Sequence, residues 1–146
     1  MVDKIDRPRL LLVNRCLVKN DAGQILVVKR AETDPWQPGK WEFPGGKLDM
    51  GQDISHALER EVLEETGLYV NLVSRMMFID SYVLPQDSKY AGLTYLMIVG
   101  KGKMIGGKLA PNKEIDQCKW VSKSEAFDMD LTDETRKALA ALDRSD

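Results

Sequence analysis

Hydrophobic residues in this chain fall into short runs separated by polar, turn-forming segments, a pattern that indicates β-strands more than long helices. One apolar run covers residues 10–18 and is followed by the Asn-, Asp- and Gly-containing segment 20–23. A second apolar run covers residues 25–28. Two such runs joined by a turn of this composition predict a β-hairpin.

Apolar residues with helical spacing occupy two other parts of the chain. The first predicts a helix from about residue 53 to 65, with Gly67 in the cap position just past its end. The second predicts a final helix that starts near Thr132, with Asp133 and Glu134 in its first turn, where negative charge is favourable. The residues that carry the helical spacing are Ile54, Ala57, Leu58, Val62, Ala138, Leu139 and Leu142.

The other segments are predicted as short strands and loops. Further strands are expected at residues 41–43, 70–73, 76–83, 93–99 and 119–121, and a short helix from about residue 124. Loops are expected at residues 31–40, at 85–91 and, as a mobile segment rich in Gly and Lys, at 101–112. Strands interleaved with three helices predict an α/β protein with a mixed sheet covered on both faces.

Length and composition favour one globular domain spanning residues 1–146. The 146 residues are 43% hydrophobic and 30% charged. A formal net charge of −2 gives no general attraction to nucleic acid polymers or to acidic membranes. Cys16 and Cys118 lie in apolar stretches and lack metal-site spacing, which favours buried free thiols. With no signal peptide or transmembrane run visible in the sequence, we expect a cytoplasmic protein.

Three acids, Glu61, Glu64 and Glu65, share one face of the first predicted helix. Like charges three or four residues apart destabilise a helix by roughly 0.2–0.5 kcal/mol per pair. A solvated acidic face, or a cluster of helix-favouring residues, would explain the pattern. A bound Mg²⁺ or Mn²⁺ would explain it too, because these ions prefer hard oxygen ligands. Glycines at Gly45 and Gly46 let the backbone approach a metal or phosphate closely.

Residues 46–68 resemble the signature box of the Nudix hydrolases. That box is Gly, five residues, Glu, seven residues, Arg-Glu, an aliphatic residue, any residue, Glu-Glu, any residue, Gly and an aliphatic residue. The positions that match are Gly46, Arg60, Glu61, Val62, Glu64, Glu65, Gly67 and Leu68. Only the first glutamate differs, being Gln52 here. The preceding WEFPGGK at residues 41–47 and the order of the flanking elements are also similar, so the resemblance covers nearly the whole chain.

The resemblance implies an α/β/α sandwich that hydrolyses a nucleoside diphosphate linked to another group. In such a reaction Mg²⁺ binds the pyrophosphate and water attacks a phosphorus. The implied metal ligands are Glu61, Glu64, Glu65 and the carbonyl of Gly45. Arg60 is implied to orient the acids.

The resemblance leaves the general base and the effect of the altered position open. The base varies in the family, and the candidates are Glu61, Glu64 and, in a later loop, Glu114. A surface loop charge explains Glu114 equally well. Gln52 keeps an oxygen but carries no charge, so we expect weaker metal affinity or one fewer ion, without loss of function.

Substrate contacts are predicted from residue type and position. Arg30 is a candidate for holding a terminal phosphate bidentately, with a surface charge at the strand end as the alternative. Lys47 is a further candidate for the substrate site. Aromatic side chains that are candidates for stacking on a base, with core packing as the alternative for each, are Trp36, Trp41, Phe78 and Tyr82. The WEFPGGK sequence resembles the branch that converts nucleoside triphosphates, including 8-oxo-dGTP, to the monophosphate and pyrophosphate.

Other functions are also compatible with parts of the sequence. The presence of Pro85 downstream of the box is a feature similar to the ADP-ribose branch. Dinucleoside polyphosphates are a further substrate class. A non-catalytic nucleotide-binding module is the alternative of another kind, although the intact acids argue against it. Isopentenyl diphosphate isomerase shares the fold but depends on histidine, and this chain has only His56. The expected partner is a small nucleotide, and homodimers are common in the family.

Overall fold

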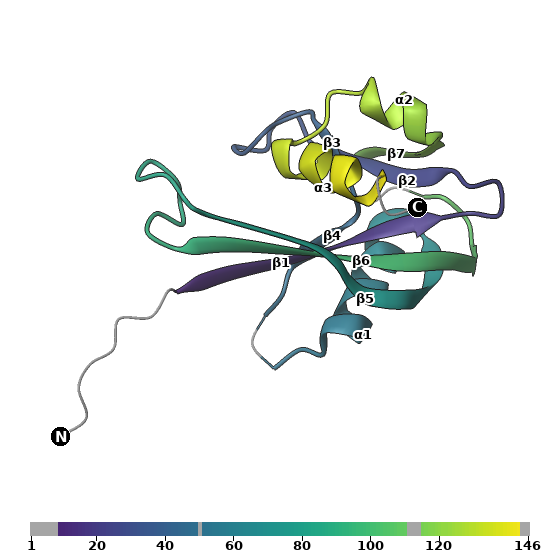
Figure 1. Ribbon diagram of the computed structural model, residues 1–146, viewed down its shortest axis with the longest axis horizontal. Helices are drawn as coiled ribbons and strands as arrows, with labels where there is room; N and C mark the ends of the chain where they lie inside the picture. The colour runs from purple at the N-terminus through teal and green to yellow at the C-terminus, as the bar shows by residue number, and fades with distance from the viewer. Residues whose placement is uncertain (1–8, 50, 111–114, 144–146) are drawn as a thin grey trace.

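In the computed structural model, residues 9–49, 51–110 and 115–143 are described, and they form one seven-stranded mixed sheet with three helices (Figure 1). The strands are β1 (Leu10–Lys19), β2 (Ile25–Arg30), β3 (Trp41–Glu42), β4 (Gly45–Lys47), β5 (Leu68–Val83), β6 (Thr94–Gly107) and β7 (Ile115–Val121). The helices are α1 (Ile54–Thr66), α2 (Lys123–Phe127) and α3 (Asp133–Asp143). The expected α/β class with a mixed sheet is confirmed.

The sheet is built around β1, which has different partners along its length. The strand order is β3-β2-β1-β6-β5, with β4 added to β1 and β7 added to β2. β1 runs parallel to β6 and antiparallel to β2 and β4. The predicted hairpin is present where Lys19 pairs with Ile25. Its turn is fixed by the Asn20 side chain, whose oxygen accepts hydrogen bonds from the N–H groups of Ala22 and Gln24, each at 3.0 Å.

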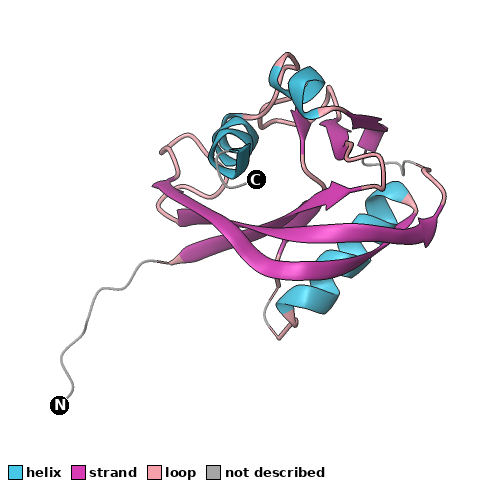
Figure 2. Cartoon of the chain, turned by 45° about the vertical axis from the view of Figure 1, so that its right-hand side comes forward, coloured by secondary structure: helices cyan, strands magenta, loops and turns pink. Residues whose placement is uncertain are grey.

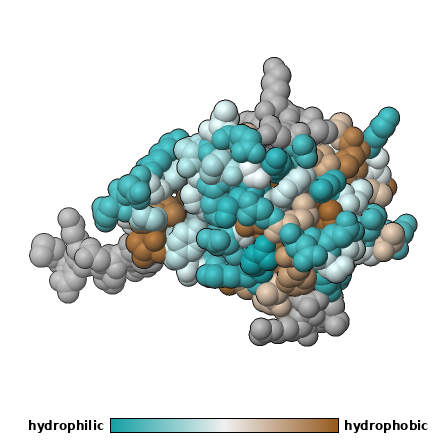
Figure 3. Space-filling view, turned by 90° about the horizontal axis from the view of Figure 1, so that it is seen from above, coloured by the Kyte–Doolittle hydropathy of each residue, from teal (hydrophilic) through white to brown (hydrophobic). Residues whose placement is uncertain are grey.

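Helices cover the sheet on both faces, as the sequence predicted. Figure 2 shows α1 against one side of β1, β5 and β6, and α2 and α3 on the other side. The α1 cluster of buried side chains is Cys16, Val18, Leu26, Leu58, Val62, Leu68 and Val70. The cluster on the α3 side includes Val13, Val27, Phe43, Met97 and Leu139. The outer surface over α2 and α3 is mainly hydrophilic (Figure 3), because these helices turn their apolar residues inward.

Helix α1 has defined ends that match its sequence signals. The Asp53 side chain accepts the His56 N–H at 3.0 Å and so caps the N-terminus. Gly67 adopts φ 79° at the C-terminus and donates to the Leu63 carbonyl at 2.8 Å. A side chain at Gly67 would also collide with the Lys108 carbonyl. The glycine is therefore required twice, for its left-handed backbone and for the close chain approach.

The predicted boundaries of three strands, β5, β6 and β7, were wrong. β5 is continuous over residues expected to form two strands, and β7 begins well before residue 119. β6 continues to Gly107, although residues 101–112 were predicted to be a mobile loop. Its pairing with β5 overrides the weak strand propensity of Gly and Lys. Gly102 is specifically suited to this place, because a Cβ there would lie 2.8 Å from the Cys16 Sγ.

Within the part of the chain that is described, no helix combines the length and apolar character needed to span a membrane.

Candidate functional site

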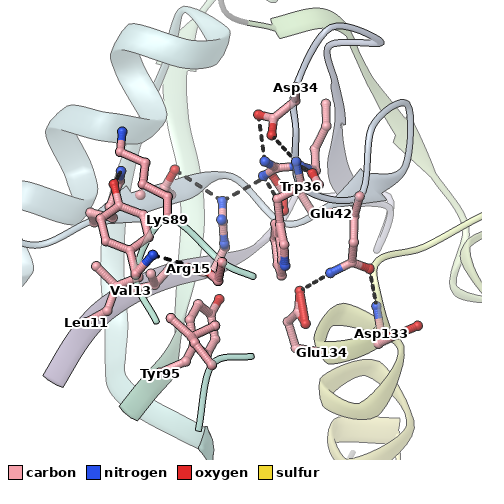
Figure 4. A pocket seen from close by; sticks show the side chains of 18 of the residues that line it. Leu11, Val13, Arg15, Asp34, Trp36, Glu42, Lys89, Tyr95, Asp133 and Glu134 are labelled. Atoms are coloured by element: carbon pink, nitrogen blue, oxygen red, sulfur yellow. Dashed lines mark hydrogen bonds and ion pairs between the residues drawn. The ribbon is translucent and has the colours of Figure 1, made fainter. Parts of the chain in front are cut away.

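A cleft of about 1370 Å³ lies on the α3 side of the sheet (Figure 4). Leu11, Val13 and Arg15 of β1 line it because alternate residues of a strand face the same side. Tyr95 of β6 pairs with Leu11, and Tyr82 of β5 pairs with Tyr95, so both tyrosines continue this wall. The loop before β3, the loop between β5 and β6 and the start of α3 complete the cleft.

Helix α1 brings two of its three predicted acids to the cleft. The Glu65 side chain is buried, and its Oε1 accepts the Gly45 N–H at 3.2 Å. Glu61 lies against Gly46, where an added Cβ would be 3.4 Å from Glu61 Oε2. Glu64 does not line the cleft, and its side chain is 56% exposed. The acids therefore separate into a cleft-facing pair at spacing i, i+4 and one solvent-facing member.

Arg60 lies beside the solvent-facing side of this group. Its Nε is 3.5 Å from Glu64 Oε1, and its Nη2 is 3.8 Å from Glu61 Oε1. A guanidinium between two carboxylates reduces their repulsion and limits their rotation. This placement fits the orienting role implied for Arg60.

The cleft-facing carboxylates have the properties of a cation site. Burial, together with the Glu42 and Glu61 charges, raises the pKa of the Glu65 carboxyl to about 8, against the opposing effects of Arg15 and the Gly45 N–H. A divalent cation would favour the ionised form of Glu65, and hard oxygen ligands suit Mg²⁺ or Mn²⁺. Among the described residues, no three His, Cys, Asp or Glu side chains are grouped closely enough to hold an ion. The site therefore offers a metal only part of its ligands, which are Glu61, Glu65 and the Gly45 carbonyl.

Arg15 fixes the turn that presents Gly45. Its Nη1 donates to the carbonyls of Gly45 at 3.2 Å and Phe43 at 3.3 Å, and lies 3.3 Å from Glu42 Oε2. Burial alone would lower the pKa of Arg15, but Glu42 and other acidic neighbours raise it above its ordinary value. The Gly45 carbonyl retains a second lone pair for another ligand. Arg15 was not predicted, although an arginine facing inward on an apolar strand was a visible signal.

Arg30 belongs to an ion-pair network. The sequence had predicted instead that its guanidinium is a candidate for holding a terminal phosphate. Its Nη2 is 2.6 Å from Asp34, its Nη1 is 3.1 Å from Glu42, and its Nε donates to the Trp36 carbonyl at 2.9 Å. The guanidinium also lies 4.7 Å from the centre of the Trp36 ring. Arg30 therefore holds the Trp36 loop against the cleft.

Aromatic rings form one wall of the cleft. Tyr82 stacks on Tyr95 with ring centres 4.8 Å apart, and Trp36 lies 6.1 Å from Tyr95. Tyr95 is 4% exposed, and burial raises the pKa of its phenol to about 12. Its hydroxyl makes no hydrogen bond among the described residues, although the nearby Arg15 guanidinium opposes the rise in its pKa. A buried, unpaired hydroxyl in a cleft is a candidate contact for a bound molecule.

Two predicted stacking residues lie outside this wall. Trp41 does not line the cleft; its backbone pairs with Asp130 and Thr132, and Lys119 Nζ lies 4.7 Å from its ring centre. Phe78 packs against the core cluster below α3. Both residues follow the packing alternative, because both are packed against the core cluster on the α3 side.

A polar pair closes the end of the cleft at α3. Gln37 donates from Nε2 to Glu134 at 3.0 Å and accepts the Asp133 N–H at 3.1 Å. Gln37 holds φ 44°, a conformation rare for a residue with a side chain. Burial raises the pKa of the Glu134 carboxyl. In the sequence, Glu134 stands out only as a favourable charge at a helix start, and no local signal points to Gln37.

The other predicted residues have varied placements. Lys47 lines the cleft directly after Gly46, and its Nζ donates to the Tyr90 hydroxyl at 2.5 Å. Gln52 braces the loop before α1, since its Oε1 accepts the Asp49 N–H at 2.8 Å. Glu114 lies outside the described residues.

Comparison with protein families and curated sequences gives a consistent result. The NUDIX domain family model matches residues 11–142. The 8-oxo-(d)GTP phosphatase of Mycolicibacterium smegmatis is 30% identical over 116 residues, which cover 80% of this chain and 32% of that protein. The nucleoside triphosphatase NudI of Escherichia fergusonii is 27% identical over 128 residues, which cover 85% and 90%. The chain thus spans about a third of the first relative's length and most of the second.

Solved structures share the fold at low sequence identity. The MutT protein of Methanosarcina mazei Go1 matches with a TM-score of 0.80 and 23% identity, covering 97% of this chain and 98% of that one. An Ap4A hydrolase from C. elegans matches with a TM-score of 0.72 and 18% identity, covering 92% and 96%. At these identities the likeness concerns the arrangement of the sheet and helices.

Proposed function

Because the chain belongs to the Nudix family, we propose that it hydrolyses nucleoside triphosphates to the monophosphate and pyrophosphate with the help of Mg²⁺. The observation that carries this proposal is the buried Glu65 carboxylate on the Gly45 turn, with Glu61 beside it, in the same cleft as an aromatic wall. The carboxylates at the Gly45 turn suit a metal–phosphate group, and the aromatic wall suits a nucleobase.

The phosphate end of the site is assigned to the turn between β4 and α1. Glu61, Glu65 and the Gly45 carbonyl would hold the ion, and Glu64 is expected to join them when it leaves Arg60. A bound Mg²⁺ supplies neutralisation of phosphate charge and lowers the pKa of a coordinated water. The part played by this chain is positioning, because Arg15 fixes the Gly45 carbonyl and the Gly45 N–H fixes Glu65.

The general base is assigned among the acids next to this turn. Glu61 is the leading candidate, because it lies at the cleft and is held from outside by Arg60. Glu64 and Glu114 stay as the other candidates. A base must lie within hydrogen-bond reach of the attacking water, directly or through one more water molecule.

The nucleoside end is assigned to the opposite part of the cleft. Trp36, Tyr82 and Tyr95 provide flat surfaces for a base, and a base edge offers donors and acceptors that match a carboxyl and an amide. Those groups are present in Glu134 and Gln37 at the end of the cleft. The name of the M. smegmatis relative makes 8-oxo-dGTP the first substrate to test.

The direct experiment is a substrate panel with purified protein and Mg²⁺. It contains dGTP, 8-oxo-dGTP, the other nucleoside triphosphates, ADP-ribose and a dinucleoside polyphosphate. Monophosphate and pyrophosphate in equal amounts are expected from at least one triphosphate. Glu65→Gln should lower that rate at least a hundredfold, whereas the exposed Glu32→Gln should not change it. Absence of hydrolysis across the panel would overturn the proposal.

A further inference from the structure

Two lysines converge on one phenol at the edge of the cleft. Lys47 Nζ donates to the Tyr90 hydroxyl at 2.5 Å and lies 4.8 Å from the centre of its ring. Lys89 Nζ lies 5.3 Å from the same ring centre. All three residues line the cleft, although they come from β4 and from the loop between β5 and β6.

The loop that carries Lys89 and Tyr90 has defined turns. Within it, Ser88 N–H donates to the Pro85 carbonyl, and Ala91 N–H donates to the Ser88 carbonyl, at 3.0 and 3.1 Å. The Tyr90 N–H also donates to the Ser88 hydroxyl at 3.1 Å. The Tyr90 side chain packs partly against the core cluster below α3. An ordered loop therefore holds Tyr90 beside Lys47 of β4.

The two ammonium groups and the Tyr90 hydroxyl place several hydrogen-bond donors together at the edge of the cleft. In the described part of the chain, neither Lys47 nor Lys89 has a carboxylate within 4.0 Å. The hydrogen bond from Lys47 lowers the pKa of the Tyr90 phenol, which is consistent with a positive environment at this hydroxyl. A phosphate oxygen would accept hydrogen bonds from both ammonium groups and from the phenol.

The position of this group within the cleft identifies which phosphate it suits. Lys47 follows Gly46, against which Glu61 lies, so Lys47 is two residues from the proposed metal ligand Gly45. Figure 4 shows Lys89 on the side of the cleft away from Trp36 and Glu134. A nucleotide with its base near Trp36 would extend its phosphates past the metal ligands toward Lys89.

We propose that Lys47, Lys89 and Tyr90 form a subsite for the terminal phosphate of a nucleoside triphosphate, which makes the enzyme prefer triphosphates to diphosphates. This inference rests on the proposed hydrolase function. Asp49 and Asp87 also line the cleft, so a general positive charge does not define this subsite. Recognition there depends on direct hydrogen bonds from Lys47, Lys89 and Tyr90.

The test compares dGTP with dGDP in wild-type protein, Lys89→Met and Tyr90→Phe. For dGTP, kcat/KM should fall about tenfold in Lys89→Met and about threefold in Tyr90→Phe, mainly through KM. For dGDP, the change should be less than twofold in both variants. Lys103→Met is the matched control, because Lys103 is an exposed lysine on β6 outside the cleft, and it should behave as wild type.

A second measurement separates the subsite from the hydrolase proposal. Binding of inorganic tripolyphosphate with Mg²⁺ is measured by calorimetry, and its Kd should rise about tenfold in Lys89→Met, with an unchanged melting temperature. Equal loss of kcat/KM for dGTP and dGDP, or unchanged Kd for tripolyphosphate, would overturn the subsite. If the wild type hydrolyses nothing but tripolyphosphate binding still depends on Lys89, the hydrolase proposal fails while the anion subsite stands without its substrate assignment.

Discussion

The Gly45 N–H donates to the Glu65 carboxylate at 3.2 Å, which ties the C-terminal turn of α1 to the short strand β4. This bond lies next to a second one, from Arg15 to the Gly45 carbonyl at 3.2 Å. The N–H of Gly45 is therefore held by a carboxylate, and the carbonyl of Gly45 is held by a guanidinium. Stability and metal affinity of the site should respond together to changes at these residues.

The buried Glu65 carboxyl should make the metal-free protein less stable as the pH rises. Its folded pKa of about 8 exceeds the ordinary value of 4.5, so the folded state binds this proton more tightly than the unfolded state. The stabilisation is complete below about pH 4.5 and is lost as the pH rises through about 8, by at most a few kcal/mol. Urea unfolding in EDTA at several pH values measures this dependence.

Glu65→Gln is the matched variant for the pH experiment, because the amide cannot ionise. Its free energy of unfolding should vary less than that of the wild type between pH 5 and 8. Saturating Mg²⁺ should restore the stability of the wild type at high pH. A pH dependence that is identical in both proteins would assign it to other groups.

Arg15→Met should destabilise the fold by about 3 kcal/mol, because it leaves the buried Glu42 carboxylate without one of its two guanidinium partners. Thermal unfolding measures the effect, with an expected decrease of about 6–12 °C in Tm. In the double variant Arg15→Met with Glu42→Gln, the loss should be smaller than the sum of the single losses. Additive losses would contradict a direct pairing.

Tyr95→Phe should separate substrate binding from stability. The hydroxyl has no partner in the described residues, so its removal should leave the free energy of unfolding unchanged or slightly higher. If the hydroxyl contacts the nucleotide, KM should rise about threefold to tenfold with kcat nearly unchanged. The exposed Tyr69→Phe on β5 is the control. Unchanged KM in Tyr95→Phe would remove this contact from the account.

Gln52→Glu should lower the Mg²⁺ concentration needed for the half-maximal rate. A glutamate can keep the bond to the Asp49 N–H and adds negative charge in the loop between β4 and α1, which joins two elements that carry proposed metal ligands. Gln117→Glu adds the same charge on β7 at an exposed position and should leave the Mg²⁺ dependence unchanged. Equal responses of the two variants would show that net charge, and not position 52, sets the affinity.

Local signals predicted the parts of the fold that local chemistry controls. The hairpin at Asn20 and the end of α1 at Gly67 follow from side-chain and backbone preferences within a few residues. The extension of β6 to Gly107 was missed because it depends on pairing with β5. Strand limits set by a distant partner are not visible in a window of sequence.

The candidate site was predictable to a similar extent. Helical spacing placed Glu61 and Glu65 together, but it could not show that Glu64 faces solvent with Arg60. The bond between Gln37 and Glu134 joins residues 97 positions apart, and no periodic pattern connects them.

We propose that the cleft-facing acids hold a divalent metal for hydrolysis. The rate of pyrophosphate release from the best triphosphate, measured as a function of Mg²⁺ concentration in wild type, Glu61→Gln and Glu32→Gln, tests this directly. We expect no hydrolysis without Mg²⁺, saturation with Mg²⁺ in the wild type and Glu32→Gln, and at least a hundredfold lower rate in Glu61→Gln. Hydrolysis that persists in EDTA, or a Glu61→Gln rate equal to that of the wild type, would contradict it.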